Sequence, residues 1–159
     1  MGKWYRIAST FRRLERIGRR RRRLLFEAAL WLSLARASIL IVPFRHLAPR
    51  IGRVAPLADG LTPVQRSTLL EAEIELVRDI GWAVTRAARY APFEAVCLPQ
   101  ALAAKMMLRR RKVPGVLFFG AARRPATGRL EAHAWVLAAG VEVTGYPSAH
   151  SFTPTVCFV

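Results

Sequence analysis

The chain has 159 residues and a formal net charge of +16, and 53% of its residues are hydrophobic. This length allows one domain, or one domain with a small helical addition, and the apolar content excludes an intrinsically disordered chain. The basic excess predicts attraction to a nucleic acid, an anionic membrane face or an acidic polypeptide. Two cysteines exclude a disulfide framework, so we expect a reducing compartment and a cytoplasmic protein.

Residues 1–60 are predicted to form a basic and apolar helical region that ends in a connector. Half of the Lys and Arg residues, 13 of 26, lie in the first fifty positions, and residues 19–23 are all arginine. Residues 24–41 are predicted to be an apolar helix that ends before Pro43. Residues 45–60 contain several Pro and Gly residues and are interpreted as a connector.

Two charges, Glu27 and Arg36, interrupt the apolar run. Burying both in a bilayer is costly, so we expect neither a membrane span nor a signal peptide, while peripheral contact with the inner face of a membrane stays open. The arginine run is first interpreted as a solvated helix face, and next as a docking site for an acidic peptide or its carrier. Nucleic-acid binding is the weaker interpretation because no known nucleic-acid fold accompanies the charge.

Residues 61–159 carry a pattern of helices followed by an antiparallel sheet. The capping motif at residues 62–65 begins a helix that runs to Tyr90, and a second helix follows Cys97 and ends in the cations 109–112. Strands are predicted at residues 116–120, 132–137, 141–146 and 154–159. A hairpin turn is predicted at residues 138–140. This order predicts an α+β fold.

The chemistry centres on Cys97 and His133. Cys97 directly precedes the predicted helix, where free backbone N–H groups and the helix dipole favour a thiolate. His133 begins a strand-like segment, where a fixed imidazole could take the proton and return it to a leaving amine. Backbone N–H groups at the start of the helix are candidates for part of an oxyanion hole. On spacing alone, an inert core cysteine and a structural histidine are the plainer alternative.

Several motifs in residues 64–159 occur together. They are Cys97-Leu98-Pro99-Gln100-Ala101-Leu102, Leu108-Arg109-Arg110-Arg111, Val113-Pro114, Gly120 and Ala132-His133-Ala134-Trp135-Val136. In combination they resemble the transglutaminase-like leader peptidases of lasso-peptide biosynthesis, the B proteins of those gene clusters. The resemblance implies a papain- or transglutaminase-like core, in which a helix bearing the cysteine packs on a small antiparallel sheet bearing the histidine.

The resemblance implies a cysteine protease that removes the leader from a ribosomally made lasso-peptide precursor. A separate ATP-dependent synthetase then closes the macrolactam on the freed amine. Members without a fused recognition domain depend on a separate leader-recognition protein, and the basic N-terminal helices look unlike such a domain, so we expect a discrete partner. We expect no cofactor and no metal, because the cysteines and histidines lack ligand spacing and no phosphate-binding loop is present.

The third catalytic residue is open. The family places an aspartate about twelve residues after its histidine, and this position is Gly145 here. Glu142 is the nominal choice because it is the only carboxylate after His133, with Thr144, Tyr146 or a Cys-His dyad as alternatives. A three-residue hairpin loop would face Gly145 toward the histidine, whereas a two-residue turn would bring Tyr146 opposite it.

Two further residues are assigned to the oxyanion or substrate cleft. Gln100 lies one helical turn after Cys97 and is a candidate oxyanion donor, although a solvated glutamine is the plainer interpretation. Trp135 shares a strand face with His133 and would shield the imidazole or line the cleft, with a buried sheet tryptophan as the default. Two other functions stay open: acyl transfer from Cys97 to an amine, and a non-catalytic protein that binds the leader, a membrane or a nucleic acid.

Overall fold

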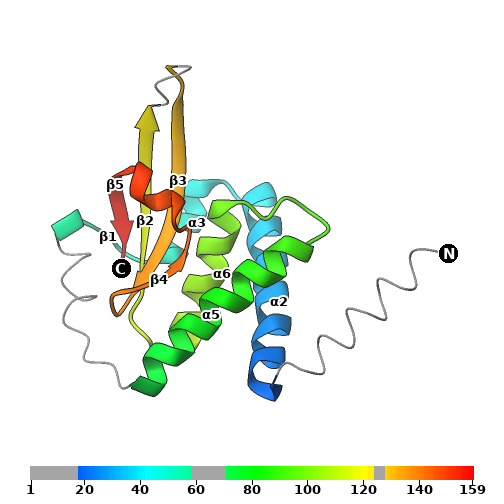
Figure 1. The fold of residues 1–159 in the computed structure, drawn as a ribbon. Coiled ribbons are helices and arrows are strands. Elements are labelled where there is room, and N and C mark those ends of the chain that lie inside the picture. Colours follow the sequence, from blue (N-terminus) through cyan, green and yellow to red (C-terminus); the bar gives the residue numbers. More distant parts are fainter. Residues whose placement is uncertain (1–17, 59–70, 124–127) are drawn as a thin grey trace.

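The computed structural model describes residues 18–58, 71–123 and 128–159. The described helices are α2 (Arg19–Ile41), α3 (Phe44–Ile51), α5 (Glu71–Tyr90) and α6 (Cys97–Arg110), with a short 3₁₀ helix η1 (Ser148–Ser151). The described strands are β1 (Val54–Ala55), β2 (Val116–Arg123), β3 (Leu130–Ala138), β4 (Val141–Thr144) and β5 (Thr153–Phe158). Helices followed by the strands of an antiparallel sheet, with only the short β1 of the described strands before α5, confirm the predicted α+β class (Figure 1). Each of the four predicted strands is present, β2 and β3 longer and β4 shorter than expected.

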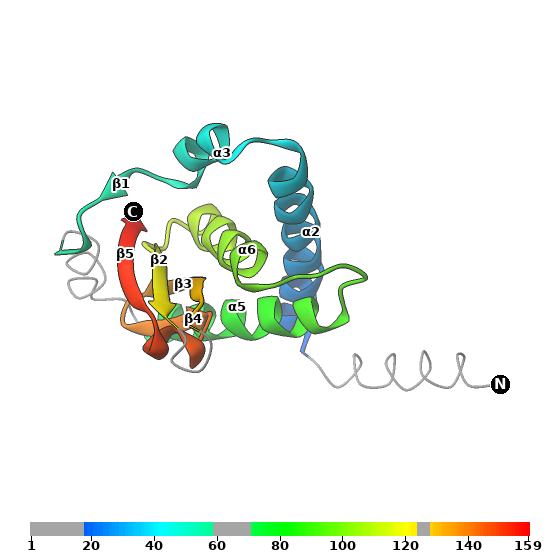
Figure 2. The ribbon, with the colours of Figure 1, turned by 90° about the horizontal axis from the view of Figure 1, so that it is seen from above.

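The described strands form one antiparallel sheet in the order β1-β5-β2-β3-β4. Helix α6 packs on this sheet, chiefly against β3, and α5 contacts β4. Helix α2 packs on α5 and α6 from the side away from the sheet, as Figure 2 shows. Helix α6 is therefore enclosed between the sheet and the other two long helices.

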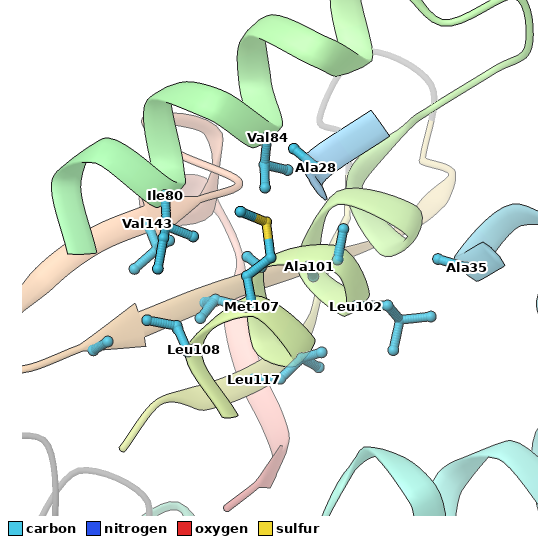
Figure 3. Packing of buried hydrophobic residues seen from close by; sticks show 14 of the residues in the cluster. Ala28, Ala35, Ile80, Val84, Ala101, Leu102, Met107, Leu108, Leu117 and Val143 are labelled. Carbon is cyan, nitrogen blue, oxygen red and sulfur yellow. The ribbon is translucent and has the colours of Figure 1, made fainter. Parts of the chain in front are cut away.

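The enclosure of α6 follows from its small and apolar residues. Ala101, Ala103 and Ala104 have no exposed surface, so neighbouring elements approach the helix backbone closely. In Figure 3 the Met107 side chain extends from α6 toward Val84 of α5. A flexible thioether suits an irregular gap of this kind. The predicted helix after Cys97 is thus the centre of the core.

The inner face of α2 completes this core. Leu24, Ala28, Leu32 and Ala35 recur at helical spacing and are buried in the same cluster as residues of α5 and α6. The predicted apolar helix is confirmed, and it begins earlier, at Arg19. The predicted division of the chain between residues 60 and 61 lies outside the described residues, but α2 shares its core with the helices that follow.

The connector predicted at residues 45–60 is wrong in its described part. It contains most of α3, with Pro49 inside the helix, and the strand β1, which pairs with β5. Pro and Gly favour a loop locally, but Ile51 is only 2% exposed, and its packing overrides the local preference. The capping motif predicted at residues 62–65 lies outside the described residues, whereas the predicted helix end at Tyr90 is confirmed.

The hairpin between β3 and β4 turns through two residues, Ala139 and Gly140. Their φ angles are 49° and 74°, as expected for a tight turn that matches the twist of the strands. A β-bulge follows, and β4 ends with Thr144 opposite Val136. Strand β3 therefore extends past the end of β4, and His133 faces no residue of β4. The two-residue turn is one of the two predicted alternatives, but the bulge shifts the register, so Tyr146 is not paired with His133 as that alternative predicted.

The carboxyl end of α6 forms polar contacts both with α2 and with the sheet. Arg111 pairs with Glu27 of α2 at 2.6 Å, and its hydrogen bond lowers the pKa of the Glu27 carboxyl. Lys105 is 7% exposed, and its ammonium donates to the carbonyl oxygens of Gly115 and Phe158. Burial lowers the pKa of Lys105 to about 8. This end of the helix is held by buried or half-buried charges.

Candidate active site

Cys97 is the first residue of α6, and its thiol is free and partly exposed. The preceding residue, Val96, has an extended backbone and offers no side-chain oxygen to cap the helix. Pro99 has no N–H, and the N–H of Gln100 donates to the carbonyl oxygen of Val96. Within the described residues, the backbone N–H groups of Cys97 and Leu98 are therefore the ones open to an anion such as an oxygen of a bound substrate. The predicted position of the thiol at a helix start is confirmed.

His133 lies on β3 beyond the end of β4, opposite Gly120 of β2. Its Nε2 atom is 2.7 Å from the carbonyl oxygen of Gly145. The ring stacks on Phe152 with a centroid distance of 4.8 Å, and Trp135 lies further away at 6.1 Å. A hydrogen bond and an aromatic neighbour together restrict how the imidazole can rotate.

One cleft of about 310 Å³ joins the cysteine and the histidine. It is lined by Thr85, Cys97, Gln100, His133, Glu142, Val143, Thr144, Gly145, Tyr146 and Ser148. Among the hydrogen bonds of the described residues, none links the Cys97 sulfur to the imidazole. Catalytic hydrogen bonds are often long before substrate binds and tighten afterwards. The fold thus brings the two predicted residues to one solvent-accessible site.

Gly145 stands where the resemblance led us to expect an aspartate. Its φ angle is 88°, a backbone conformation that favours glycine. A Cβ atom here would lie 2.5 Å from the Cβ of Trp135 and 2.8 Å from the carbonyl oxygen of Ala134. The backbone carbonyl of this residue, rather than a carboxylate, accepts the imidazole hydrogen bond. From the sequence, the only signal at this position was that glycine replaces the aspartate of the family.

The other candidates for a third residue line the cleft, and the one hydrogen bond of the His133 imidazole within the described residues goes to Gly145 rather than to any of them. The Glu142 carboxylate is 3.2 Å from Nε2 of His150, and both side chains are largely exposed. Thr144 is buried, and its hydroxyl has no partner within the described part of the chain. Burial raises the pKa of Tyr146 to about 12, and the nearby Glu142 adds to this effect. Glu142 as a catalytic residue therefore stays a prediction.

The two predicted cleft residues differ in position. Gln100 lines the cleft, and its amide nitrogen donates to the carbonyl oxygen of Ala95 at 2.7 Å, which fastens the turn before Cys97. Trp135 is 6% exposed and stacks on Phe118 with a centroid distance of 5.7 Å. Trp135 is therefore a buried tryptophan of the sheet, which is the default interpretation given above. Gln100 keeps a second amide hydrogen with which it could reach a substrate.

The fold and the cleft define an α+β protein that presents a helix-start thiol and a sheet histidine to one site. This constellation is suited to acyl transfer through a thioester. A family model described as the transglutaminase-like superfamily matches residues 38–157, and the chain belongs to this superfamily. No curated protein and no solved structure matches the chain. Membership confirms the superfamily expected from the motifs and is compatible with a cysteine peptidase or an acyltransferase.

Proposed function

We propose that this protein is a cysteine peptidase that removes the leader from a lasso-peptide precursor. The observation that carries the proposal is one cleft that is lined both by Cys97 at the start of α6 and by His133 on β3. The superfamily membership supports acyl chemistry at this cysteine. The lasso-peptide substrate rests on the resemblance of the motifs, and we expect a leader-recognition protein to deliver the peptide and an ATP-dependent synthetase to use the product.

The histidine is proposed to act through Nδ1. A carbonyl oxygen only accepts hydrogen bonds, so the contact with Gly145 places the proton of a neutral imidazole on Nε2. The lone pair of Nδ1 is then available to take the proton of the Cys97 thiol. The imidazole must approach the sulfur when substrate fills the cleft, as expected for a site that tightens on binding.

The reaction proceeds in two balanced steps. The Cys97 sulfur attacks the scissile carbonyl carbon, the carbon–nitrogen bond breaks, and His133 delivers its proton to the departing amine. Water then attacks the thioester while His133 takes its proton, and the carbon–sulfur bond breaks to release the carboxylate product and restore the thiol. The first backbone N–H groups of α6 are proposed to stabilise the oxyanion in both steps.

The two rivals differ in their use of the Cys97 thiol. An acyltransferase would form the same thioester but would use an amine in place of water in the second step, so its product would contain a new amide bond. A non-catalytic leader-binding protein would form no thioester, and its Cys97→Ala variant would bind the leader as the wild type does. Glu142 and Tyr146 line the cleft, and neither favours an acyltransferase or a leader-binding protein over the peptidase.

The proposed function is tested by mass spectrometry of the precursor peptide from the same gene cluster, incubated with this protein and its leader-binding partner. We expect hydrolysis at one bond, abolished in Cys97→Ala and His133→Ala. Glu142→Gln tests whether the one downstream carboxylate contributes. An amide-linked product would establish the transferase instead. Absence of any product from the wild type with its partner present would refute the enzymatic proposal.

A further inference from the structure

The outer face of α2 is apolar and exposed along most of the helix. The outer stripe consists of Phe26 (71% exposed), Leu30 (56%), Leu34 (46%), Leu40 (68%) and Ile41 (79%). Most of these positions follow helical spacing, so they form one continuous surface rather than scattered side chains. Single exposed hydrophobic residues are ordinary, but a contiguous apolar surface marks a contact site. Figure 2 shows α2 at the edge of the molecule, with the other long helices on its inner side.

A cationic hollow lies at the amino end of the outer stripe. It has a volume of about 380 Å³ and is lined by Arg19, Arg22, Arg23 and Phe26. The intervening Arg20 and Arg21 are paired with Asp79 at 3.2 Å and 2.8 Å. No salt bridge within the described residues neutralises the three arginines of the hollow. Cations at a helix amino terminus oppose the helix dipole, so a bound anion would relieve two sources of repulsion.

Helix α2 is long and apolar enough to cross a membrane by length and composition. Its inner face, however, is part of the core. Leu24, Ala28 and Leu32 are at most 3% exposed and pack with α5 and α6. A helix that spanned the bilayer would leave these partners uncovered. Contact in the plane of the membrane uses the outer stripe alone and leaves the core intact.

We propose that the outer stripe and its cationic hollow bind the surface of an anionic phospholipid bilayer. Phe26 belongs to both features, so the cations and the apolar side chains lie side by side. Lipid phosphates would occupy the hollow, and the stripe would lie among the first carbons of the acyl chains. Arginine guanidiniums are well suited to phosphate oxygens. This places the proposed peptidase at a membrane face, independently of whether its substrate assignment is correct.

A bilayer fits these features better than the other occupants do. A nucleic acid or a purely acidic peptide would use the arginines and leave the apolar stripe in water. A second copy of this chain would bring the same arginines together and repel itself, since the net charge of each copy is +16. Anionic lipids satisfy both requirements with one ligand.

The test is cosedimentation of the full chain with vesicles of phosphatidylcholine alone or with phosphatidylglycerol added. We expect at least tenfold tighter binding to the anionic vesicles, and this binding should weaken as salt increases. Leu30→Glu combined with Leu34→Glu should reduce it at least tenfold. The matched control is Val54→Glu combined with Leu130→Glu, which places the same two charges at exposed apolar residues of β1 and β3 (57% and 73% exposed) and should leave binding unchanged.

A second pair of variants separates the position of the charge from its amount. The triple variant Arg19→Gln, Arg22→Gln, Arg23→Gln should lose most binding to the anionic vesicles. The triple variant Arg78→Gln, Arg86→Gln, Arg89→Gln removes the same charge from another arginine-lined hollow, on α5, and should retain it. If both triple variants lost vesicle binding equally, the binding would depend on net charge alone, and the proposal would be overturned. Absence of binding by the wild type would also overturn it, as would self-association, measured by light scattering, that the stripe variants abolish.

Discussion

The two ends of α6 serve different purposes on one helix. The amino end leaves the Cys97 thiol partly exposed in a cleft, with backbone N–H groups and no capping side chain. Toward the carboxyl end, the Lys105 ammonium donates to the Phe158 carbonyl of β5, and Arg111 pairs with Glu27 of α2. Reactivity requires an accessible group with unsatisfied donors beside it, whereas anchoring requires each charge to have a partner. Changes at the two ends should therefore affect different measurements.

The largest expected effect is at the amino end. Replacing Cys97 with Ser should reduce turnover roughly a thousandfold or more, because the proposed thiol nucleophile is lost. Thermal stability should change little, since the side chain is partly exposed. The matched control is Cys157→Ala, where the lost thiol is fully buried and bonded to the Ala55 carbonyl. This variant should lose about 1 kcal/mol of stability and retain activity. Equal turnover losses in both variants would contradict the assignment.

The next effect concerns the residue that contacts the imidazole. Gly145→Ala should lower kcat by about 10- to 100-fold, because a Cβ at this position displaces the carbonyl that holds His133. Gly140→Ala is the control: its φ of 74° is equally unusual, but no atom lies within 4 Å of its Cβ position. It should lose stability alone. Activity is measured per folded molecule, and the Nε2 proton resonance of His133 should change only in Gly145→Ala. Full activity in that variant would refute the positioning role.

At the carboxyl end, the stability of the wild type should depend on pH through Lys105. Its pKa is about 8 in the folded protein against 10.5 ordinarily, because burial disfavours the charged form. The unfolded chain therefore binds more protons between these values, so stability should rise by about 2 kcal/mol from pH 8 to pH 10. Lys105→Met should flatten this rise in urea-unfolding measurements. An identical slope in the variant would show that the lysine is not desolvated in solution.

A smaller effect is expected for the ion pair between α6 and α2. Arg111→Ala should lose about 1–2 kcal/mol of stability at pH 7, because the pair is only partly buried. The folded pKa of Glu27 is lowered, so this contribution is present above the ordinary carboxyl pKa and is lost as the pH falls through the folded value. Arg110→Ala should cost less, since that side chain is 62% exposed and 3.5 Å from Glu27. Turnover of folded protein should not change in either variant.

The smallest effect returns to the amino end. Gln100→Ala should lose about 1 kcal/mol or less, because its hydrogen bond to the Ala95 carbonyl is half-exposed. Activity should fall only severalfold if the residue serves the loop before Cys97. A loss of a hundredfold or more, with unchanged stability, would instead indicate that the second amide hydrogen reaches the oxyanion.

The helices and strands were largely readable from the sequence. The helix that begins at Cys97 and the strand around His133 followed from local signals: a proline in the first turn, a cationic helix end and a run of strand-forming residues. The connector was wrong because the burial of Ile51 depends on contacts with residues far along the chain. Local Pro and Gly content carries no information about such contacts.

The sequence by itself determined the α+β order of elements, the apolar helix and the two residues that carry the proposed chemistry. Tertiary structure decided how these residues are brought together and what supports the histidine. A two-residue turn followed by a bulge ends β4 early, and the backbone then directs the Gly145 carbonyl at His133. Register and backbone direction depend on the packing of the whole sheet, so the sequence indicated an absent aspartate and only the fold supplied its substitute.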